Sequence, residues 1–379
     1  MHKLHSITPA AVHQLACLAL APLRIEGYKS VPKDYTLRLL LRIASTATTL
    51  FDAARRTLRF SHETARKAVY HNLPEPDVLA NRINDCLHVV LRMPARVRRR
   101  VAFVLAIDTH HVPFYGDKTR PGVVGGPKKA GTKYAHAYAT VCVVEKGQRY
   151  TLGLVRVSAK SKPHELVEAL LRIVESRGIR IKGVVLDAGF DSGETLLLLR
   201  DRKLNYAVPL KRKGHGSNRR NALFDLPHGH EGWAEWTTEK SRRAVRTRVV
   251  VWQGESKKWV FAYSGWSAAG ASSKAATVRE WYRRRFGIET SYRQKNRCRG
   301  WTTSANESYR LLLEGVAHVL RQVWVYLTAE IAASRVGLGE KWVKELPLRW
   351  MLEWLSVALF RANEMQIPLD PVLASQGEN

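Results

Sequence analysis

The sequence predicts a mixed α/β chain with helices at both ends, and three observations support this fold class. Between about residues 100 and 210, apolar runs of strand length alternate with stretches of helical periodicity. Two of these runs, 101–107 and 183–186, are followed directly by an aspartate. Both ends of the chain carry apolar residues at helical spacing. Together these patterns predict an open sheet covered by helices.

The composition indicates a nucleic-acid partner. The chain has 379 residues, with 62 Lys and Arg against 33 Asp and Glu, which gives a net charge of +29. This excess is spread along the whole chain, whereas membrane-binding proteins concentrate basic residues in a local tract. No apolar run reaches the roughly 18 residues of a membrane span. The four cysteines form no CxxC pair, so we expect a reducing compartment and a cytoplasmic, nucleoid-associated protein.

Residues 1–98 are predicted to be a helical, DNA-binding region. Apolar residues recur at helical spacing over 36–58, and a second helix over 61–70 begins at a capping serine. Two tightly joined helices are compatible with a helix-turn-helix, but equally with any small helical bundle. The basic segment 92–100 could follow a phosphate backbone or be a solvated junction.

Residues 99–210 are predicted to be the first part of a ribonuclease-H-like core. The predicted order is strand, two-stranded hairpin, helix, strand, helix and strand, at 101–107, 134–144, 150–157, 163–176, 183–186, 193–202 and 206–210. This order is the layout of that fold, although periodicity alone supports only a mixed α/β class. The aspartates favour the narrower class, because open sheets place active sites at strand ends. Residues 115–133, rich in Gly and Lys, are expected to form a loop.

Asp108 and Asp187 are the candidate catalytic acids of this core. Each ends an apolar strand, whereas the nearby Asp117 and Asp191 fall in predicted loops. Metal-assisted phosphoryl transfer on DNA needs carboxylates that hold two metal ions, and hard ions such as Mg²⁺ prefer oxygen ligands. Either aspartate could instead be an ordinary strand-end turn residue.

Residues 211–275 are predicted to form a β-rich insertion. After a basic loop come short alternating segments that hold several tryptophans: Trp233, Trp236, Trp252, Trp259 and Trp266. A small sheet with an aromatic core would explain any of them, and stacking on an unpaired base is the alternative. Trp266 is the stacking candidate, because it follows a strand-like run and precedes a loop of small residues.

Residues 276–303 are predicted to hold the helix that completes the site, starting at a capping box opened by Thr277. Tyr282, Arg285 and Glu289 are spaced by three and four residues, so they share one helical face. An arginine one turn before an acid keeps the carboxylate ionised, which suits a metal ligand. A solvated ion pair would give the same pattern. Residues 304–379 are predicted to be scaffold helices.

The order Tyr, two residues, Arg, three residues, Glu resembles the signature of DDE transposases, specifically insertion-sequence family four of bacteria and archaea. The resemblance covers roughly residues 100–335. The family pattern continues with a lysine seven positions after the Glu, where this chain has Asn296 and carries Lys295 one residue early. Arg293, Lys295 and Arg297 are the candidates for that role, and the sequence leaves the choice open.

The resemblance implies a function as well as a fold. Asp108, Asp187 and Glu289 would be the catalytic acids and would hold two Mg²⁺ ions, with Mn²⁺ as a substitute. Tyr282 and Arg285 would position a DNA phosphate. The enzyme would nick the element ends, cleave the second strand, in relatives through a DNA hairpin, and join the 3′-hydroxyl to target DNA. A homodimer on two paired DNA ends is expected.

Two alternatives to a cut-and-paste transposase stay open at this point. One is a host nuclease of the same fold, which would cut DNA without joining it. The other is a catalytically silent derivative that binds DNA alone. The presence of all three acids argues against the silent derivative.

Overall fold

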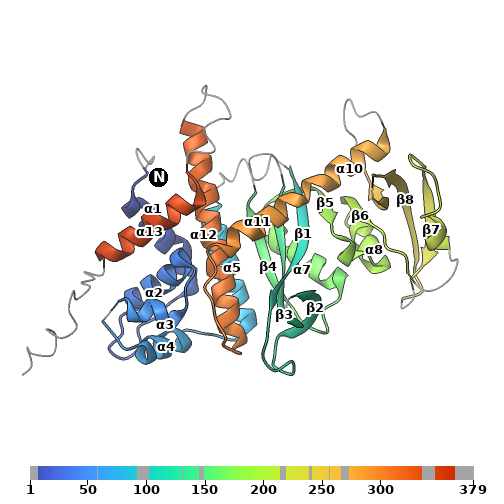
Figure 1. The fold of residues 1–379 in the computed structure, drawn as a ribbon. Coiled ribbons are helices and arrows are strands. Elements are labelled where there is room, and N and C mark those ends of the chain that lie inside the picture. The colour runs from blue at the N-terminus through green and yellow to red at the C-terminus, as the bar shows by residue number, and fades with distance from the viewer. Residues whose placement is uncertain are drawn as a thin grey trace, which may run out of the picture.

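The computed structural model describes residues 7–57, 59–91, 102–129, 131–144, 149–213, 219–238, 241–255, 257–265, 273–334 and 346–362. Along the molecule, a helical part made from both ends of the chain lies beside a part built on one sheet (Figure 1). None of the helices in these ranges is long and apolar enough to cross a membrane.

The helical part joins the two ends of the chain in one hydrophobic core. Its members are α1 (Pro9–Leu20), the short turn η1 (Ala21–Leu23), α2 (Lys33–Thr46), α3 (Leu50–Arg55), α4 (His62–His71), α5 (Pro76–Val90), α12 (Glu307–Ser334) and α13 (Leu348–Ala362). The single helix predicted over 36–58 is wrong, because Ala47 takes a left-handed backbone (φ 48°) that ends α2. The predicted cap of the next helix is confirmed, since the Ser61 hydroxyl accepts a hydrogen bond from the Thr64 amide at 3.1 Å.

The described strands form one nine-stranded sheet in the order β2-β3-β1-β5-β6-β9-β8-β7, with β4 also paired to β3. They are β1 (Ala102–Pro113), β2 (Val123–Lys129), β3 (Thr132–Val143), β4 (Thr151–Val157), β5 (Arg180–Leu186), β6 (Asn205–Pro209), β7 (Glu231–Thr237), β8 (Ala244–Gln253) and β9 (Lys258–Ser264). β2 lies in a segment predicted to be a loop, where Val123 and Val124 pair with β3 despite the neighbouring glycines. β7, β8 and β9 continue the core sheet, because β9 pairs with β6.

Helices cover both faces of this sheet. α7 (Pro163–Ser176), the turn η2 (Ala188–Phe190) and α8 (Gly193–Asp201) pack on one face, and α10 (Lys274–Arg284) and α11 (Phe286–Asn296) pack on the other. A short helix, α9 (Arg219–Ala222), precedes β7. Alternate residues of β1 reach opposite faces, so Leu105 and Ile107 join the α7 side while Val104 and Ala106 join the α10 side. The next residue in the second series is Asp108, which therefore faces α11.

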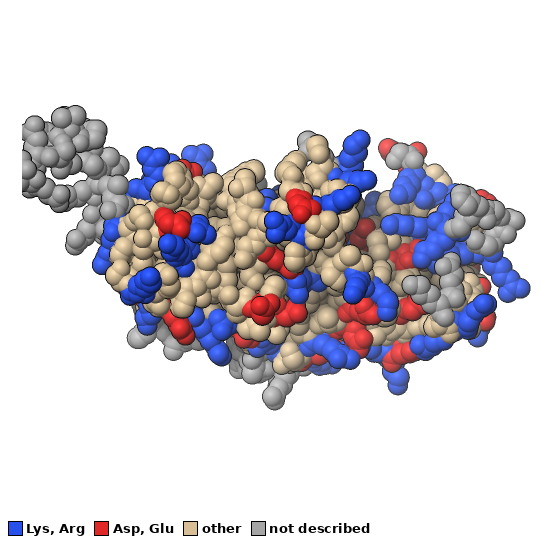
Figure 2. All heavy atoms as spheres, turned by 90° about the horizontal axis from the view of Figure 1, so that it is seen from below, with Lys and Arg blue, Asp and Glu red and all other residues tan. Residues whose placement is uncertain are grey.

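The surface carries the basic excess over its whole length. Figure 2 shows Lys and Arg side chains from one end of the molecule to the other, with Asp and Glu side chains between them. The distribution matches the sequence, in which basic residues occur throughout the chain. Such a field attracts a polyanion along an extended surface.

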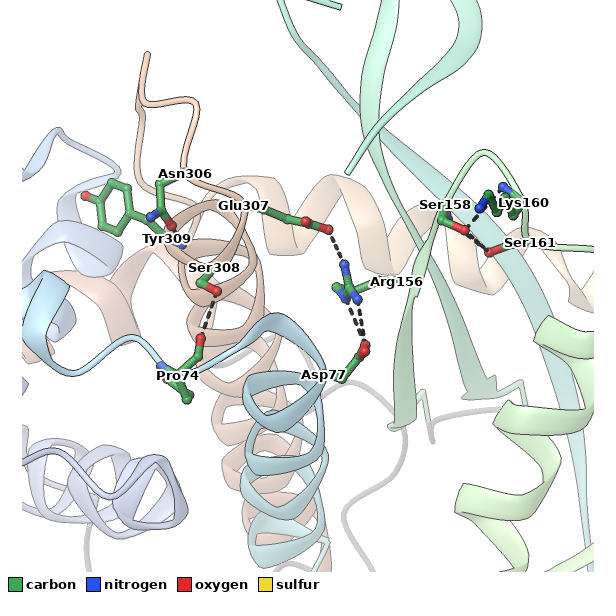
Figure 3. A network of polar contacts seen from close by, with 10 residues as sticks. All are labelled: Pro74, Asp77, Arg156, Ser158, Lys160, Ser161, Asn306, Glu307, Ser308 and Tyr309. Carbon is green, nitrogen blue, oxygen red and sulfur yellow. Dashed lines mark hydrogen bonds and ion pairs between the residues drawn. The ribbon is translucent and has the colours of Figure 1, made fainter. Parts of the chain in front are cut away.

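The helical part is fixed to the sheet through its edge strand β4. The Asn84 side chain from α5 makes two hydrogen bonds with the backbone of Leu154, at 2.8 and 3.0 Å. Gln322 from α12 does the same with Thr151, at 3.0 and 3.1 Å. Beside them, Arg156 of β4 joins acids from two helices, Asp77 of α5 at 2.7 Å and Glu307 of α12 (Figure 3). These contacts fix α12, and with it the segment that leads from α11 into α12.

Candidate active site

The two predicted aspartates lie side by side on neighbouring strands. The parallel ladder between β1 and β5 ends at the pair Ile107 and Leu186, so Asp108 and Asp187 are the next residue on each strand. The expectation that Asp108 closes its strand is wrong, because β1 continues to Pro113 by pairing with β3 alone. Asp187 does end β5, and its carboxylate accepts a hydrogen bond from the Gly189 amide at 3.2 Å.

The helix predicted to complete the site is divided in two at Arg285. The backbone of this residue is helical (φ −54°, ψ −34°), and α10 and α11 end and begin beside it. The N-cap of α10 is Ser273, whose hydroxyl accepts from the Ala276 amide at 3.2 Å, and not the predicted Thr277. Thr277 lies inside the first turn and donates its hydroxyl to the Ser273 carbonyl. Tyr282, Arg285 and the acid one turn later nevertheless stay on one face.

The Arg285 guanidinium lies among the three candidate acids. It donates to Glu289 at 2.9 Å and to Asp108 at 3.1 Å, and its Nη2 is 3.7 Å from an Asp187 oxygen. The arginine side chain is 7% exposed and that of Asp108 is 15% exposed, whereas Asp187 and Glu289 open to solvent at 38% and 37%. The cluster is therefore buried at the sheet and open on the side of Asp187 and Glu289.

Burial and charge shift the titration of Asp108 and Arg285 in this cluster. Burial raises the pKa of Asp108 to about 6, against the opposing effect of Arg285, and the carboxylates of Asp187 and Glu289 raise it further. Burial alone would lower the pKa of Arg285, but the Tyr282 hydroxyl and the three acids raise it above its usual value. Burial is thus the main reason for the raised pKa of Asp108, and the neighbouring carboxylates add to it.

The donor set fits a divalent metal ion. Asp108, Asp187 and Glu289 offer carboxylate oxygens, the ligands that Mg²⁺ and Mn²⁺ prefer, and all three already meet one cationic group. Across the residues that the structure describes, no group of three or more His, Cys, Asp or Glu side chains lies at metal-binding spacing. In this cluster the Arg285 guanidinium lies among the carboxylates and meets all three.

A tyrosine of α11 supports the Asp108 backbone from the sheet side. The Tyr292 hydroxyl donates to the Asp108 carbonyl at 3.0 Å and lies 2.8 Å from the Thr140 hydroxyl on β3. Its ring packs on the His110 ring at 4.8 Å between centroids. Burial lowers the pKa of His110 to about 3, so this imidazole is neutral and serves packing. Tyr292 lies seven residues after Arg285, and that helical spacing could have found it.

Lys295, one of the expected DNA contacts, lies in the protein core. Its ammonium group pairs with Glu314 of α12 at 2.5 Å, and both side chains are almost fully buried. Burial lowers the pKa of Lys295 to about 8, while Lys295, despite burial, keeps the pKa of Glu314 well below its usual value. His318 lies 3.4 Å from the same carboxylate. The expected phosphate contact of Lys295 conflicts with this placement, because the ammonium group has no exposed surface.

The other expected DNA contacts fall in three classes. Tyr282 is buried against Phe261, with ring centroids 5.0 Å apart, and burial raises its pKa to about 12. Arg293 is exposed on α11 and stays available to a phosphate. Trp266 lies outside the described residues, as does the basic segment 92–100.

Asp117 and Asp191, the two aspartates that the sequence analysis placed in predicted loops, make local structural contacts. Asp191 is buried, forms an ion pair with Arg220 and accepts a hydrogen bond from the Lys211 amide at 2.8 Å. Asp117 is exposed and accepts from the amide and hydroxyl of Thr119 at 2.9 and 2.8 Å, as a turn carboxylate does. Neither residue takes part in the cluster around Arg285.

The chain is similar to a known protein family and to a solved structure. Residues 102–318 match the family model described as "Transposase DDE domain". Among solved structures, a similar one is described as "Cryo-EM structure of piggyBac transposase synaptic complex with hairpin DNA", with a TM-score of 0.61 and 13% identity over 99% of this chain and 85% of that chain. No curated protein matches the chain. At that identity the likeness concerns the fold, and it confirms the predicted ribonuclease-H-like α/β class.

Proposed function

This chain belongs to the transposase DDE domain family, and from that premise we propose that Asp108, Asp187 and Glu289 are its catalytic acids. The chain is a DDE transposase, an enzyme of DNA transposition whose family uses divalent metal ions. The observation that carries the assignment is the position of Arg285, which meets all three carboxylates with one guanidinium. Three acids around one cation are what a divalent metal site on this fold requires.

The acids would hold two Mg²⁺ ions, or Mn²⁺ in their place. When bound, such ions activate a water or a 3′-hydroxyl and stabilise the oxygen that leaves phosphorus. Hydrolysis at an element end breaks a phosphorus–oxygen bond and frees a 3′-hydroxyl. This hydroxyl then attacks the phosphorus of a target phosphodiester, forms a new phosphorus–oxygen bond and expels the 3′-oxygen of the target strand. Tyr292 keeps the Asp108 backbone in place through this sequence.

Arg285 would have two positions in the reaction cycle. Without metal it neutralises part of the charge of the acids, in keeping with its distances to them. Metal ions at the same carboxylates would compete with the guanidinium and release it to a DNA phosphate, which arginine binds with two parallel hydrogen bonds. Arg293, exposed two turns further along the same helical stretch, is the candidate for the next phosphate.

The DNA substrate would be double-stranded, with element ends and target DNA as its two forms. The charge of +29 supports this, as does the spread of basic side chains over the surface (Figure 2). The Tyr-Arg-Glu spacing supports a place in insertion-sequence family four. A homodimer on paired ends and a hairpin intermediate are part of the same proposal, for which the synaptic complex of the similar piggyBac transposase with hairpin DNA offers a precedent on the same fold.

The test uses the protein with a labelled DNA fragment that carries the element end and its flank. We expect Mg²⁺-dependent cleavage at the end, followed by a longer strand-transfer product when target DNA is added. The matched control is Glu289→Gln, which should not cleave but should bind the fragment within about tenfold of wild type, or about 1.4 kcal/mol. Cleavage without joining would indicate a nuclease, and binding without cleavage would indicate a silent derivative. Normal cleavage by the variant would remove Glu289 from the site.

A further inference from the structure

Asp187 is the candidate acid whose position depends most on a turn. One of its oxygens is 3.7 Å from the Arg285 guanidinium, farther than the 3.1 and 2.9 Å of the other two acids. Those two acids lie inside regular elements, Asp108 in β1 and Glu289 in α11. Asp187 instead comes directly after β5, at the start of the turn η2. The contacts that hold this turn therefore decide where the Asp187 carboxylate lies.

Hydrogen bonds within residues 187–191 make this turn a closed unit. The Phe190 amide donates to the Asp187 carbonyl at 3.0 Å, and the Asp191 amide donates to the Ala188 carbonyl at 3.3 Å. The Asp187 carboxylate accepts from the Gly189 amide at 3.2 Å. Because the first and last residues of the turn are connected by these bonds, a displacement of Asp191 also displaces Asp187.

The Asp191 side chain fixes the last residue of the turn. Its carboxylate forms an ion pair with Arg220 and accepts a hydrogen bond from the Lys211 amide at 2.8 Å. Its backbone carbonyl accepts from the Lys213 ammonium group at 2.7 Å. The side chains of Asp191 and Arg220 are only 1% and 8% exposed, so this pair is shielded from water. Removal of one partner from such a buried pair leaves an uncompensated charge.

Arg220 connects the turn to the segment 211–275. It belongs to α9, its Nε donates to the Lys211 carbonyl at 3.3 Å, and its guanidinium lies over the Trp236 ring of β7 at 5.1 Å. Asn221 beside it makes two hydrogen bonds with the Lys213 backbone, at 3.0 and 3.1 Å. Residues 211–213 and 219–221, where the segment begins, are thus held to each other and to the turn of Asp187.

We propose that Asp191 and Arg220 are positioning residues for Asp187. They hold its turn against the start of the segment 211–275, which keeps the Asp187 carboxylate in place to take a divalent metal ion. Neither residue contacts the acid cluster, so both act through the turn. The inference rests on the proposed function, because it treats Asp187 as a metal ligand. Residues that orient a metal ligand typically change metal affinity about 10–100-fold when they are replaced.

The test measures Mn²⁺ binding by the full-length protein without DNA, from the electron paramagnetic resonance signal of the free ion. We expect Asp191→Asn to raise the dissociation constant of Mn²⁺ roughly tenfold. Asp225→Asn is the matched control, because Asp225 also pairs with an arginine of the same segment, Arg212 at 2.8 Å, but both side chains are exposed. It should bind Mn²⁺ as wild type does. Equal dissociation constants in the two variants would overturn the positioning role.

A second pair of variants separates positioning from folding. Arg220→Met leaves Asp191 buried without its partner and should lower stability in urea, whereas Arg220→Met combined with Asp191→Leu removes both charges and should recover most of that loss. The double variant still lacks the carboxylate that accepts the Lys211 amide, so its Mn²⁺ dissociation constant should stay roughly tenfold above that of wild type. A double variant that recovers stability and Mn²⁺ affinity together shows that the pair supports the fold alone, which also overturns the role.

Glu289→Gln keeps this result distinct from the proposed function. Loss of a proposed ligand should weaken Mn²⁺ binding in that variant. If Glu289→Gln weakens binding and Asp191→Asn does not, the positioning role is wrong and the three acids stand. Wild-type protein that binds no Mn²⁺, or binds it no better than Glu289→Gln does, overturns the proposed function and the inference together.

Discussion

At the scale of single residues, the site is governed by the balance between one arginine and three acids. Arg285 is almost fully buried and contacts Asp108 and Glu289 directly, with Asp187 slightly further away. Without it, three carboxylates would repel one another at the end of a buried ladder. Arg285 therefore keeps the acids close together, while the burial of Asp108 and its two neighbouring carboxylates raise the pKa of that residue.

Asp108 gives the first prediction, which concerns stability and pH. The pKa of Asp108 is about 6 in the folded protein, above the ordinary 3.8, so the folded state holds its proton more tightly. Stability is therefore lost as pH rises from about 4 to 6, and Asp108→Asn should avoid this loss. We expect the variant to be more stable than the metal-free wild type by about 2 kcal/mol at pH 8, with the difference shrinking towards pH 4.

Urea unfolding at pH 4, 6 and 8, in the presence of a chelator, measures this difference. Thr119→Val, which touches the exposed Asp117 and not the cluster, is the control and should show no such pH dependence. A constant difference between Asp108→Asn and wild type at all three pH values would refute the explanation.

At the scale of elements, α11 reaches the site through its Tyr-Arg-Glu face and reaches the core through Lys295. The ion pair between Lys295 and Glu314 joins α11 to α12, and both groups are buried. Since α12 is itself fixed to β4, this pair connects the catalytic helix to the helical part of the molecule. Lys295, which stands one residue before the position of the family lysine, thus has a structural partner in Glu314.

The second prediction follows from that ion pair. Lys295→Met leaves Glu314 buried and without its partner, which should lower the free energy of unfolding by about 3–5 kcal/mol. The double variant Lys295→Met, Glu314→Leu removes both charges and should recover most of the loss. Urea unfolding of the single and double variants measures the coupling. If the double variant loses as much as the sum of its two single variants, the two charges do not depend on each other.

The same elements show what the sequence can and cannot predict. Asp108 and Asp187 are recognisable as candidates, because the apolar run of each strand stops there. The continuation of β1 to Pro113 could not be recognised from the sequence, because it depends on pairing with β3, a separate segment of the chain. The expectation that Lys295 contacts DNA conflicts with its burial because spacing alone does not tell which face of α11 meets α12. The position of Glu314 between the apolar runs 311–313 and 316–317 of α12 is the available signal of a buried charge.

At the scale of the whole molecule, the helical part and the sheet part hold the site between them. The described residues put α5 and α12 against β4 and put α11 across the sheet (Figure 1). Residues 299–303, on the connection from α11 to α12, line a pocket together with the end of β1 and the first turns of α12. This pocket could not be predicted from the sequence, because its walls come from separate segments of the chain.

The third prediction concerns the charge of the molecule as a whole. With a net charge of +29, DNA binding should weaken steeply with salt. Several phosphate contacts should give a log–log slope of several units, at about 0.9 per contact. Titrations of paired DNA between about 50 and 200 mM salt measure the slope. Arg293→Gln should reduce it by about one unit, whereas Arg349→Gln, an exposed arginine on α13, should leave it unchanged.

A flat salt dependence of the wild-type protein would contradict a binding mode based on phosphate contacts. An equal reduction of the slope by both variants would instead remove Arg293 from the interface. These two outcomes are distinguishable, because the wild-type slope is measured first.

The most direct test of the central claim locates the metal ion on the chain itself. Fe²⁺ with ascorbate and peroxide cuts a polypeptide next to the residues that bind the ion, and Mg²⁺ or Mn²⁺ at the same place prevents the cuts. If Asp108, Asp187 and Glu289 hold the ion, wild-type protein should be cut near all three positions, and Asp108→Asn and Glu289→Gln should lose the cuts together. Cuts elsewhere, or cuts that persist in both variants, would contradict the assignment.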